Sequence, residues 1–519
     1  MVGYDGTSPG PTFRINRDTE TVVRYVNKYD RPSSVHLHGS YSRAPFDGWA
    51  ADVIEPGEYK DYYFPNAQRA RTLWYHDHAE HITAVNAYSG QAGFYIIEDD
   101  QAETLGLPTG DYDIPLMLQA KEYTKTGQLT DISTERDSLY GDIFQVNGQI
   151  APYFAVEPRK YRFRLLNAAA SRTFNLTLQD ADENVVPVTV VGADGGISFK
   201  SVQTPNLIMA MAERWEVVID FAEFRGQNLT LGSRTETDAR NGARLFFDTD
   251  YWNEGFGPVM QFNVKDSDPI SEVGNGAVPE ALATDITRGV THTEVDQAYF
   301  FTRIGATVAT REWIIQVTND GQTEQRRFND PNNRIIRNVP RGTTEHWTFR
   351  SGGGWSHPIH VHLVDFEITE RTGGRGGRSA YEIEAVKDVV SVGAGETVHV
   401  NAIFAPWDGV YMFHCHNLVH EDTDMMGAFN VTNLPSLGYN DTRFNDPMEQ
   451  QFRAVPYTEA ASEEAAIEVL QKFADFEAYE HEEEIEASLN AYHAALPERT
   501  SGAYVPLKTI AARRVRRRL

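Results

Sequence analysis

The sequence predicts an all-β protein, and two observations point to this fold class. Turn signals such as Pro9-Gly10 and Asp408-Gly409 recur along the chain, and short runs rich in β-branched and aromatic residues, such as 21–26 and 397–400, lie between them. Amphipathic segments of helix length are scarce before residue 455. This alternation of short runs and turns is typical of antiparallel β-sandwiches and barrels.

The length of 519 residues predicts about three domains, at roughly 150 residues per domain. Two strand-rich stretches predict a first domain at 1–100 and a second at 101–265. The segment 266–296 is rich in Asp, Ser, Gly and Pro, which predicts a linker. A third β domain is predicted at 297–435, followed by an extension of different composition at 436–519.

The C-terminal extension is the one place where the pattern favours a helix. Its segment 462–489 is rich in Glu and Ala, and apolar residues recur there at helical spacing: Ile467, Leu470, Phe473 and Phe476. We therefore expect a helix that packs on the body of the protein. The basic run 513–518 is interpreted as a solvated tail rather than a binding site.

Charge and composition exclude several classes of protein. The formal net charge of −27 argues against a nucleic-acid-binding protein, because an acidic surface repels phosphate. No run reaches about 18 consecutive apolar residues, so no membrane span is expected. Cys415 is the single cysteine, which rules out an intrachain disulfide.

The sequence contains only weak signals for the cellular location of the protein. The first residues have neither the basic region nor the apolar core of a signal peptide. Four Asn-x-Ser/Thr sequons are compatible with a secreted glycoprotein: Asn175, Asn228, Asn430 and Asn440. This motif is short and common by chance, so it does not establish secretion.

Ten of the sixteen histidines fall in four short clusters. The clusters contain four His-x-His pairs: His36 and His38, His76 and His78, His360 and His362, His414 and His416. On a strand, residues i and i+2 lie roughly 7 Å apart on one face, so each pair can present two imidazoles to two neighbouring metal ions. Eight such imidazoles can hold a three-ion cluster with positions open to dioxygen. Imidazole suits copper, zinc and iron alike.

Cys415 narrows the choice of metal. It lies between His414 and His416 and therefore points to the opposite face of the strand. With His357, His420 and Met425 it makes two histidines, one thiolate and one thioether, the ligand set of a blue-copper site. Zinc prefers a compact tetrahedral set without methionine. The alternative, a structural metal site with coincidental histidines, is less consistent with this set.

These motifs resemble those of the multicopper oxidase family, and within it the fungal bilirubin oxidases, with spore-coat laccases more distant. The resemblance spans roughly residues 3–450 and is strongest in five stretches: 35–39, 73–79, 156–164, 355–363 and 411–422. It implies three cupredoxin-like Greek-key β-barrels and four copper ions, one type 1, one type 2 and two type 3.

The resemblance also implies a role for each ligand. The implied type 1 ligands are His357, Cys415, His420 and Met425, with Met426 in the core instead. The implied type 2 ligands are His36 and His360. The implied type 3 ligands are His38, His76, His78, His362, His414 and His416.

Two further residues, Asp47 and Trp355, match functional positions of the family, and Glu421 directly follows the implied ligand His420. Asp47 is expected to deliver protons to the cluster, against the alternative of a plain turn aspartate. Glu421 is expected either to deliver protons or to fix the orientation of a histidine ligand. Trp355 is expected to contact substrate or relay electrons, against the alternative of core packing. The remaining histidines are interpreted as ordinary structural residues: His81, His292, His346, His399, His481 and His493.

Two departures from the family pattern affect the scaffold. Relatives carry additional strand residues before the segment 3–6, so we expect a truncated first domain with one uncovered sheet edge. The stretch 313–328 is longer and more polar than in the family, which suggests an insertion near the substrate rim.

The expected reaction couples four one-electron oxidations of an organic reductant to the reduction of dioxygen to water. Bilirubin and related tetrapyrroles are the first candidate substrates, and phenols and aromatic amines the second. A ferrous or cuprous oxidase and a copper-binding protein without turnover remain alternatives. By the same resemblance, the protein is expected to be a secreted monomer with no nucleic-acid or membrane partner.

Overall fold

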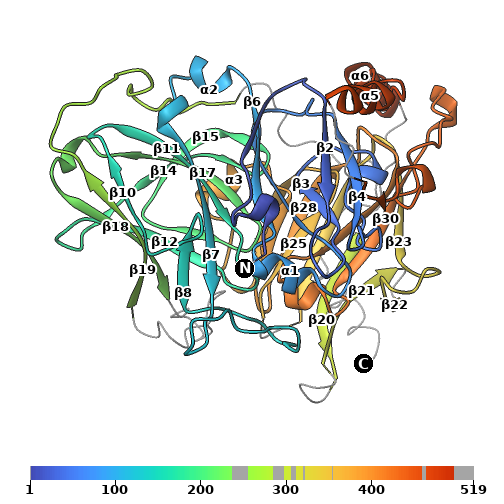
Figure 1. Ribbon diagram of the computed structural model, residues 1–519, viewed down its shortest axis with the longest axis horizontal. Coiled ribbons are helices and arrows are strands. Elements are labelled where there is room, and N and C mark those ends of the chain that lie inside the picture. Colours follow the sequence, from blue (N-terminus) through green and yellow to red (C-terminus); the bar gives the residue numbers. More distant parts are fainter. Residues whose placement is uncertain are drawn as a thin grey trace, which may run out of the picture.

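The computed structural model describes residues 2–235, 255–283, 297–305, 311–319, 322–352, 355–458 and 463–495. Strands dominate and gather in six sheets, while the helices are short and lie at the periphery or between strands (Figure 1). The all-β prediction is confirmed. The predicted domain limits at residues 100, 265, 297 and 435 stay predictions.

The N-terminal part of the chain forms two sheets. The strands of the first are, in order, β1 (Phe13–Asn16), β6 (Ala92–Glu98), β5 (Arg71–Asp77) and β3 (Val35–His38). Those of the second are β2 (Thr21–Val26), β4 (Glu58–Phe64) and β31 (Val455–Pro456). Strand β31 belongs to the C-terminal extension and pairs with β4. The C-terminal extension therefore covers the β4 edge of this second sheet.

The middle part of the chain forms a seven-stranded and a six-stranded sheet on the left of Figure 1. The seven-stranded sheet has the order β15 (Gly196–Thr204), β14 (Val188–Ala193), β17 (Arg214–Asp220), β11 (Lys160–Asn167), β7 (Asp113–Lys121), β8 (Ile143–Val146) and β9 (Gln149–Ile150). The facing sheet has the order β10 (Tyr153–Val156), β19 (Gly255–Val264), β18 (Asn228–Thr235), β12 (Phe174–Gln179) and β13 (Val185–Val186), with β16 (Leu207–Met209) also paired to β12.

The third pair of sheets carries most of the candidate ligands. The six-stranded sheet has the order β22 (Gln322–Arg326), β21 (Glu312–Asn319), β20 (Gln297–Ile304), β24 (Thr344–Ser351), β28 (Thr397–Ile403) and β26 (Phe366–Thr372). The five-stranded sheet has the order β23 (Ile335–Pro340), β30 (Met426–Thr432), β29 (Gly409–Cys415), β25 (His357–Val361) and β27 (Val389–Val392).

The described helices are six α-helices and six 3-10 turns. The α-helices are α1 (Thr83–Ser89), α2 (Gln101–Thr104), α3 (Ala380–Ile383), α4 (Leu418–Glu421), α5 (Glu463–Ala474) and α6 (Glu482–Ala495). The 3-10 turns are η1 (Tyr4–Gly6), η2 (Ala44–Phe46), η3 (Gly110–Tyr112), η4 (Ala222–Phe224), η6 (Pro435–Leu437) and η7 (Gln450–Phe452). None of these described helices has the length and apolar character needed to cross a bilayer.

The helical prediction for the C-terminal extension is confirmed in part. The expected single helix is two, α5 and α6, because Glu477 and His481 between them adopt positive φ, which no α-helix accommodates. Phe473 is buried against Phe46 and Tyr63 of the first domain. Ile467 and Leu470 are exposed, so the predicted apolar stripe is only half used. The basic run 513–518 lies outside the described residues.

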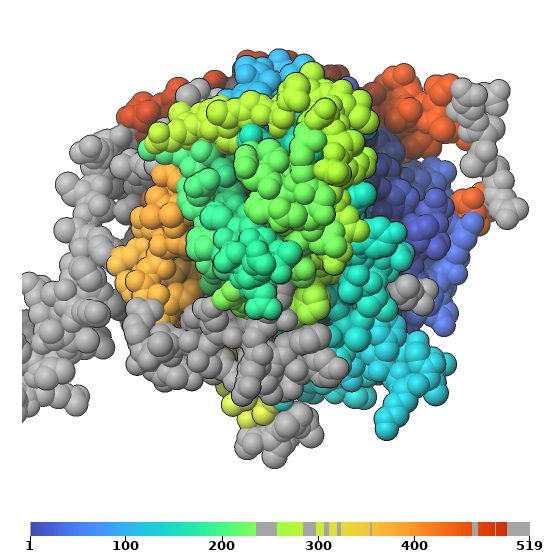
Figure 2. Space-filling view, turned by 90° about the vertical axis from the view of Figure 1, so that its left-hand side faces the viewer, coloured from blue at the N-terminus to red at the C-terminus, as the bar shows by residue number. Residues whose placement is uncertain are grey.

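The described part of the predicted linker is docked on the second domain. The Arg159 guanidinium donates to the carbonyls of Ser271 and Val273, and the Ser201 hydroxyl donates to the Pro279 carbonyl over 2.8 Å. Figure 2 shows this yellow-green segment lying across the surface of the green second-domain strands. The linker therefore adds a layer to the second domain before the chain enters the third.

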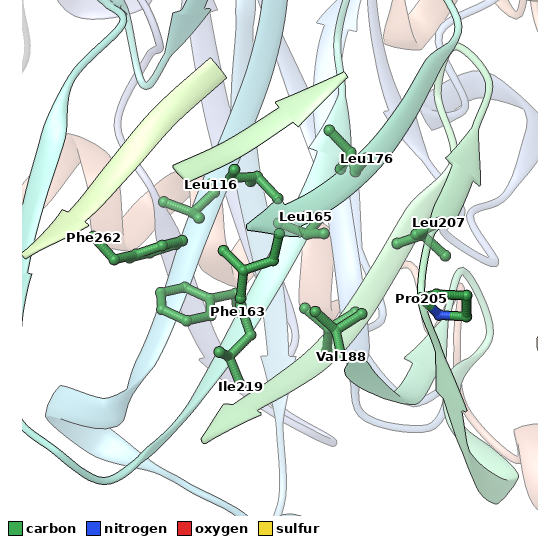
Figure 3. A pocket seen from close by; sticks show the side chains of 12 residues that line it. Leu116, Phe163, Leu165, Leu176, Val188, Pro205, Leu207, Ile219 and Phe262 are labelled. Carbon is green, nitrogen blue, oxygen red and sulfur yellow. The ribbon is translucent and has the colours of Figure 1, made fainter. Parts of the chain in front are cut away.

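The second domain encloses a small apolar cavity. Its volume is about 20 Å³, and its walls are aliphatic and aromatic side chains such as Leu165, Phe163 and Phe262 (Figure 3). Apolar cavities of this size hold no stable water, because they offer no polar partner. The cavity is a packing gap in a barrel core and contributes no candidate functional group.

The stretch 313–328 is built into the third domain. Its first half is β21, which pairs with β20 and buries Trp313, Ile315 and Val317 in the main core. Only β22, the outer strand of the hairpin, is polar and largely exposed. The polar character predicted for this stretch is thus wrong for its first half, and its being an insertion stays a prediction.

One of the four sequons is also excluded as a glycan site. Asn175 lies on β12, is buried, and accepts a hydrogen bond from the Asn206 side chain over 2.7 Å. An N-linked glycan cannot be carried on a buried side chain. Asn228 and Asn440 are exposed.

Candidate metal centres

The four His-x-His segments meet between the N-terminal sheet and the third domain. Each begins on a strand: β3, β5, β25 and β29. All eight imidazoles are buried, and they come from positions up to 380 residues apart: His36, His38, His76, His78, His360, His362, His414 and His416. Period-2 geometry places the two histidines of a pair on one face, as predicted.

Three of these imidazoles form the first group. One ring nitrogen each of His38, His76 and His416 lies within 4.8 Å of the other two. His76 Nδ1 donates to the Asp77 carbonyl over 2.8 Å, which leaves a lone pair on Nε2. His76 Nε2, His38 Nδ1 and both nitrogens of His416 are buried without a hydrogen-bond partner among the described residues. Unsatisfied buried nitrogens that converge on one point fit a metal ion.

A second group is built from His78, His362 and His414. The His414 Nε2 atom lies 3.1 Å from His78 Nε2 and 3.2 Å from His362 Nε2. In this group His414 lies on β29, whereas His78 and His362 each lie just after the end of a strand. The two groups share no histidine. They are neighbours, because the His76–His78 pair and the His414–His416 pair each place one histidine in either group.

A two-histidine group completes the cluster. His36 Nε2 and His360 Nε2 lie 3.3 Å apart. With a metal–nitrogen bond of about 2.0–2.1 Å, one ion can reach both atoms. A nitrogen of His362 lies within 4.8 Å of both, so this group borders the second one.

Asp47 orients two ligands from a single turn. It follows η2 and is buried; its carboxylate oxygen Oδ2 accepts from His362 Nδ1 over 2.7 Å, and its backbone carbonyl accepts from His36 Nδ1. These contacts leave Nε2 of both rings free to face the cluster. Burial raises the pKa of Asp47 well above its ordinary value, although Lys60 opposes the shift.

Glu421 lies behind two ligands of the second group. Its carboxylate oxygens are 3.0 Å from His414 Nδ1 and 3.6 Å from His78 Nδ1. Burial works to raise the pKa of Glu421, but the His414 and His78 rings lower it to about 2. The anion is therefore placed to hold both rings with Nε2 towards the cluster.

Asp388 is a site residue that the sequence did not reveal. It is buried, its Oδ1 accepts from His38 Nε2 over 3.2 Å, and its backbone carbonyl accepts from His360 Nδ1 over 2.9 Å. Arg214 of β17 donates to the same carboxylate over 2.7 Å. The histidine clusters gave no signal for it, because Asp388 contacts ligands 350 and 28 residues away.

Burial keeps the ligand rings neutral. It lowers the pKa of His76 to about 3, with a further contribution from His78, and lowers the pKa of His78 to about 4 despite Glu421. Burial similarly lowers the pKa of His357 to about 3. Neutral imidazole is the form that binds metal ions.

The mononuclear group lies on the opposite face of β29. Cys415 Sγ is 3.5 Å from His357 Nδ1 and 3.7 Å from His420 Nδ1, and the two nitrogens are 3.2 Å apart. His420 Nε2 donates to the Asp137 carbonyl over 2.9 Å, which fixes Nδ1 as the ligand atom. Burial raises the pKa of the Cys415 thiol, so binding a metal ion is what would release its proton.

The two neighbouring methionines have different surroundings. Met425 is buried in the core cluster that contains Cys415, its carbonyl accepts from the Cys415 N–H, and its N–H donates to the His420 carbonyl. Met426 begins β30 and packs in another cluster with Trp49 and Met412. This difference is consistent with Met425 as the fourth ligand and Met426 as a core residue.

Two tryptophans surround His420. The half-buried Trp355 ring contacts the His420 ring edge to face, with centroids 5.8 Å apart. Trp313, which sequence reasoning placed in an insertion, stacks on His420 at 3.7 Å and donates from Nε1 to the Arg136 carbonyl. The second-domain segment 136–140 therefore contacts the mononuclear site at several points.

The donor sets fit copper. Two histidines, a thiolate and an adjacent methionine suit a blue-copper ion, and eight neutral imidazoles with carboxylates behind them suit a cluster of borderline ions. Within the described residues, every predicted histidine ligand lies in one of these groups.

Most of the leftover histidines lie apart from these groups. His81, His481 and His493 contact other surface or backbone groups, and His292 lies outside the described residues. His346 and His399 contact each other.

Comparisons with known proteins agree with this geometry. Multicopper oxidase family profiles match residues 1–102 and 305–435. The chain is 48% identical over 463 residues to a bilirubin oxidase from Albifimbria verrucaria, covering 88% of this chain and 77% of that one. It is 30% identical over 488 residues to a laccase from Bacillus subtilis, covering 83% of this chain and 90% of that one.

A solved structure shares the same fold. The multicopper oxidase McoA from Aquifex aeolicus superposes with a TM-score of 0.69 at 25% identity, covering 81% of this chain and 89% of that one. Both ends of the site, the His36 region and the Cys415 region, fall within the matched family profiles. The chain therefore belongs to the multicopper oxidases, copper-dependent oxidoreductases that use dioxygen as electron acceptor.

Proposed function

We propose that this oxidase couples one-electron oxidation of an organic reductant at a mononuclear site to four-electron reduction of dioxygen to water at a three-ion cluster. The observation that carries the proposal is the sequence His414-Cys415-His416, in which three consecutive side chains enter three different ligand groups. When bound, a type 1 copper would accept single electrons, and a type 2 and two type 3 coppers would reduce dioxygen.

The residues divide into two sets under this proposal. The type 1 ligands are His357, Cys415, His420 and Met425, and the type 2 ligands are His36 and His360. The type 3 ligands are His38, His76 and His416 in one group and His78, His362 and His414 in the other, which agrees with the two groups of converging nitrogens. One peptide link on each side joins Cys415 to His414 and His416, so the two sites are connected through one strand.

The test of the proposal is oxygen consumption by the copper-loaded chain with bilirubin and, separately, with a phenolic donor. We expect consumption of one dioxygen for every four electron equivalents, with no accumulation of hydrogen peroxide. A copper-loaded sample that consumes no dioxygen with any donor would instead support a copper-binding protein without turnover.

The substrate class follows only from similarity. The bilirubin oxidase relative supports tetrapyrroles, and the laccase relative supports phenols and aromatic amines. The same similarity supports a secreted enzyme, and the exposed sequons at Asn228 and Asn440 are compatible with it. A monomer is the simplest assembly in which all ligand groups are complete, since one chain supplies each of them.

We assign proton delivery to Asp47. One carboxylate oxygen is committed to His362, while Oδ1 is buried without a hydrogen-bond partner in the described structure and lies 3.7 Å from His36 Nδ1. An oxygen so placed can accept and pass on a proton beside the cluster. Glu421, held by His414 and His78, is assigned a positioning role for these two rings.

The Asp47→Asn variant separates the two roles of Asp47. The amide oxygen can still accept from His362, so ligand orientation is retained, but an amide cannot carry a proton. We expect reoxidation of the reduced enzyme by dioxygen to slow by about 100-fold. Stopped-flow reoxidation measures this, and anaerobic reduction by donor is the internal control, with an unchanged rate. Wild-type reoxidation in the variant would refute the proton role.

We assign Trp355 to the substrate face, because it is half-buried beside His420 and stacks nearly parallel on Tyr140. In Trp355→Leu we expect kcat/KM for a phenolic donor to fall roughly tenfold, through loss of a positioned ring. The visible spectrum and copper content should not change, and Trp355→Phe should retain most activity. An unaltered kcat/KM in the leucine variant would assign Trp355 to packing.

A further inference from the structure

Two histidines outside the copper centres lie together on the third domain. His346 is on β24 and His399 is on the neighbouring antiparallel strand β28. The register sets His346 opposite Asn401 and Thr348 opposite His399, so the two rings are diagonal neighbours on one face of the sheet. The intervening residues, such as Trp347 and Val400, point into the core that contains Cys415. The histidine pair therefore faces away from the mononuclear site.

Hydrogen bonds determine the tautomers of this pair. Asn401 Oδ1 is an acceptor only and lies 2.7 Å from His346 Nδ1, so His346 Nδ1 carries a proton. In the neutral ring, His346 Nε2 then bears a lone pair. His399 Nδ1 lies 3.1 Å from it and 3.0 Å from the Thr348 hydroxyl oxygen, so with this tautomer of His346 its N–H is shared between the two acceptors. The lone pair of His346 thus points directly at a second imidazole nitrogen.

The spacing of the two nitrogens matches that of metal ligands. At a metal–nitrogen distance of about 2.0–2.1 Å, atoms 3.1 Å apart subtend an angle of about 100° at a shared ion. This angle lies between octahedral and tetrahedral values. The same separation recurs in the copper centres, where His78 and His414 nitrogens are 3.1 Å apart and His36 and His360 nitrogens 3.3 Å apart.

The histidine pair is also held in place by a hydrogen bond, and one of its two rings is partly exposed to solvent. Asn401 holds the outer nitrogen of His346, the arrangement that orients histidine ligands in metalloproteins. His346 is only partly buried, and Asn401 lies on the wall of a hollow of about 310 Å³. Glu367, which the register places opposite Asn401, lines the same hollow together with Glu482 and Glu486 of α6. Arg17 and Arg71 also line it, so charged groups of both signs lie beside Asn401 in the wall of the hollow.

We propose that His346 and His399 form a fifth metal site, for a borderline divalent ion such as Ni²⁺, Cu²⁺ or Zn²⁺. The imidazoles would bind through His346 Nε2 and His399 Nδ1, and water would fill the remaining positions. On binding, the proton of His399 Nδ1 transfers to Nε2 of the same ring through solvent, so both rings stay neutral and no net proton is released. Mg²⁺ and Ca²⁺ are not the expected ions, because they prefer oxygen ligands to imidazole nitrogen.

Nickel is the probe that tests this site. In N/O sites Ni²⁺ binds less tightly than Cu²⁺, so it does not displace resident copper, and elemental analysis distinguishes the two metals. The copper-loaded full chain is dialysed to equilibrium against Ni²⁺ alone. We expect one nickel bound per chain at unchanged copper content, together with a rise in the thermal unfolding midpoint, because a ligand that binds only the folded state stabilises it.

Matched variants assign the nickel to this pair. His346→Gln and His399→Gln should each weaken nickel binding at least tenfold and abolish the rise in midpoint, while their copper content and visible spectra stay as in the wild type. The control is His481→Gln, which removes an exposed histidine flanked by Glu480 and Glu484 and should bind nickel like the wild type. Equal nickel binding in wild type and both pair variants overturns the proposal, as does a folded, copper-loaded wild type that binds no nickel.

Discussion

Replacing the single cysteine, Cys415→Ser, is expected to abolish the intense blue absorption that the proposed type 1 site predicts and to lower oxygen consumption by at least about 100-fold. Loss of contacts behind metal ligands already costs 10–100-fold in activity, and this change removes a ligand itself. A serine hydroxyl stays protonated where a thiolate binds copper. The proposed cluster ligands His414 and His416 keep their backbone, so roughly three of the four proposed coppers should remain. Visible and spin-resonance spectra with copper analysis measure the result.

Met426→Leu is the matched control for this experiment. Met426 is buried one residue beyond Met425 but packs with Trp49 and Met412 in a different cluster. A volume-conserving change there should cost less than about 1.5 kcal/mol and leave spectrum and turnover intact. If Cys415→Ser kept the blue band, or if Met426→Leu lost it, the assigned ligand set would be incorrect.

The Asp388→Ala variant is expected to lose about 3 kcal/mol of unfolding free energy and to bind copper less completely. The change leaves the Arg214 guanidinium buried without its main partner, and breaking a buried ion pair costs about 3–5 kcal/mol. The lower end applies because Asp194 remains 3.6 Å from Arg214. Copper occupancy should fall because His38 loses the acceptor that holds its Nε2 proton. Urea unfolding and copper analysis measure the two effects.

Asp61→Ala is the control for the loss of an aspartate from an arginine pair. Asp61 accepts two hydrogen bonds of 2.7 Å from Arg24, but this pair is partly exposed, and such pairs contribute at most about 1 kcal/mol. Copper content should not change in this variant. Similar unfolding free energies for Asp388→Ala and Asp61→Ala would show that Asp388 does not tie the cluster to the second domain.

The candidate histidine and cysteine ligands could be recognised in the sequence because the pattern that marks them is local. A strand alternates its side chains with period two, so His-x-His defines two ligands on one face and Cys415 one ligand on the other. The structure brings these residues together as expected, with His414 and His416 in different groups and Cys415 in a third. The fold class followed from the same periodicity, repeated over many short runs.

The helical extension shows where local pattern stops being sufficient. Ile467, Leu470, Phe473 and Phe476 share helical spacing, yet only the two phenylalanines pack on the body. Which part of an apolar stripe is buried depends on the partner surface, here Phe46 and Tyr63 of the first domain. The pairing of β31 with β4 has the same origin, since it joins residues almost 400 positions apart.

The sequence alone predicted the candidate ligands, the copper chemistry that they favour and the β architecture, because each of these is carried by residues a few positions apart. Only the tertiary structure decided how the ligands are held. Asp388 orients His38, Asp137 orients His420, and Trp313 stacks on His420. These contacts depend on how sheets and domains pack against each other, and no spacing along the chain encodes them.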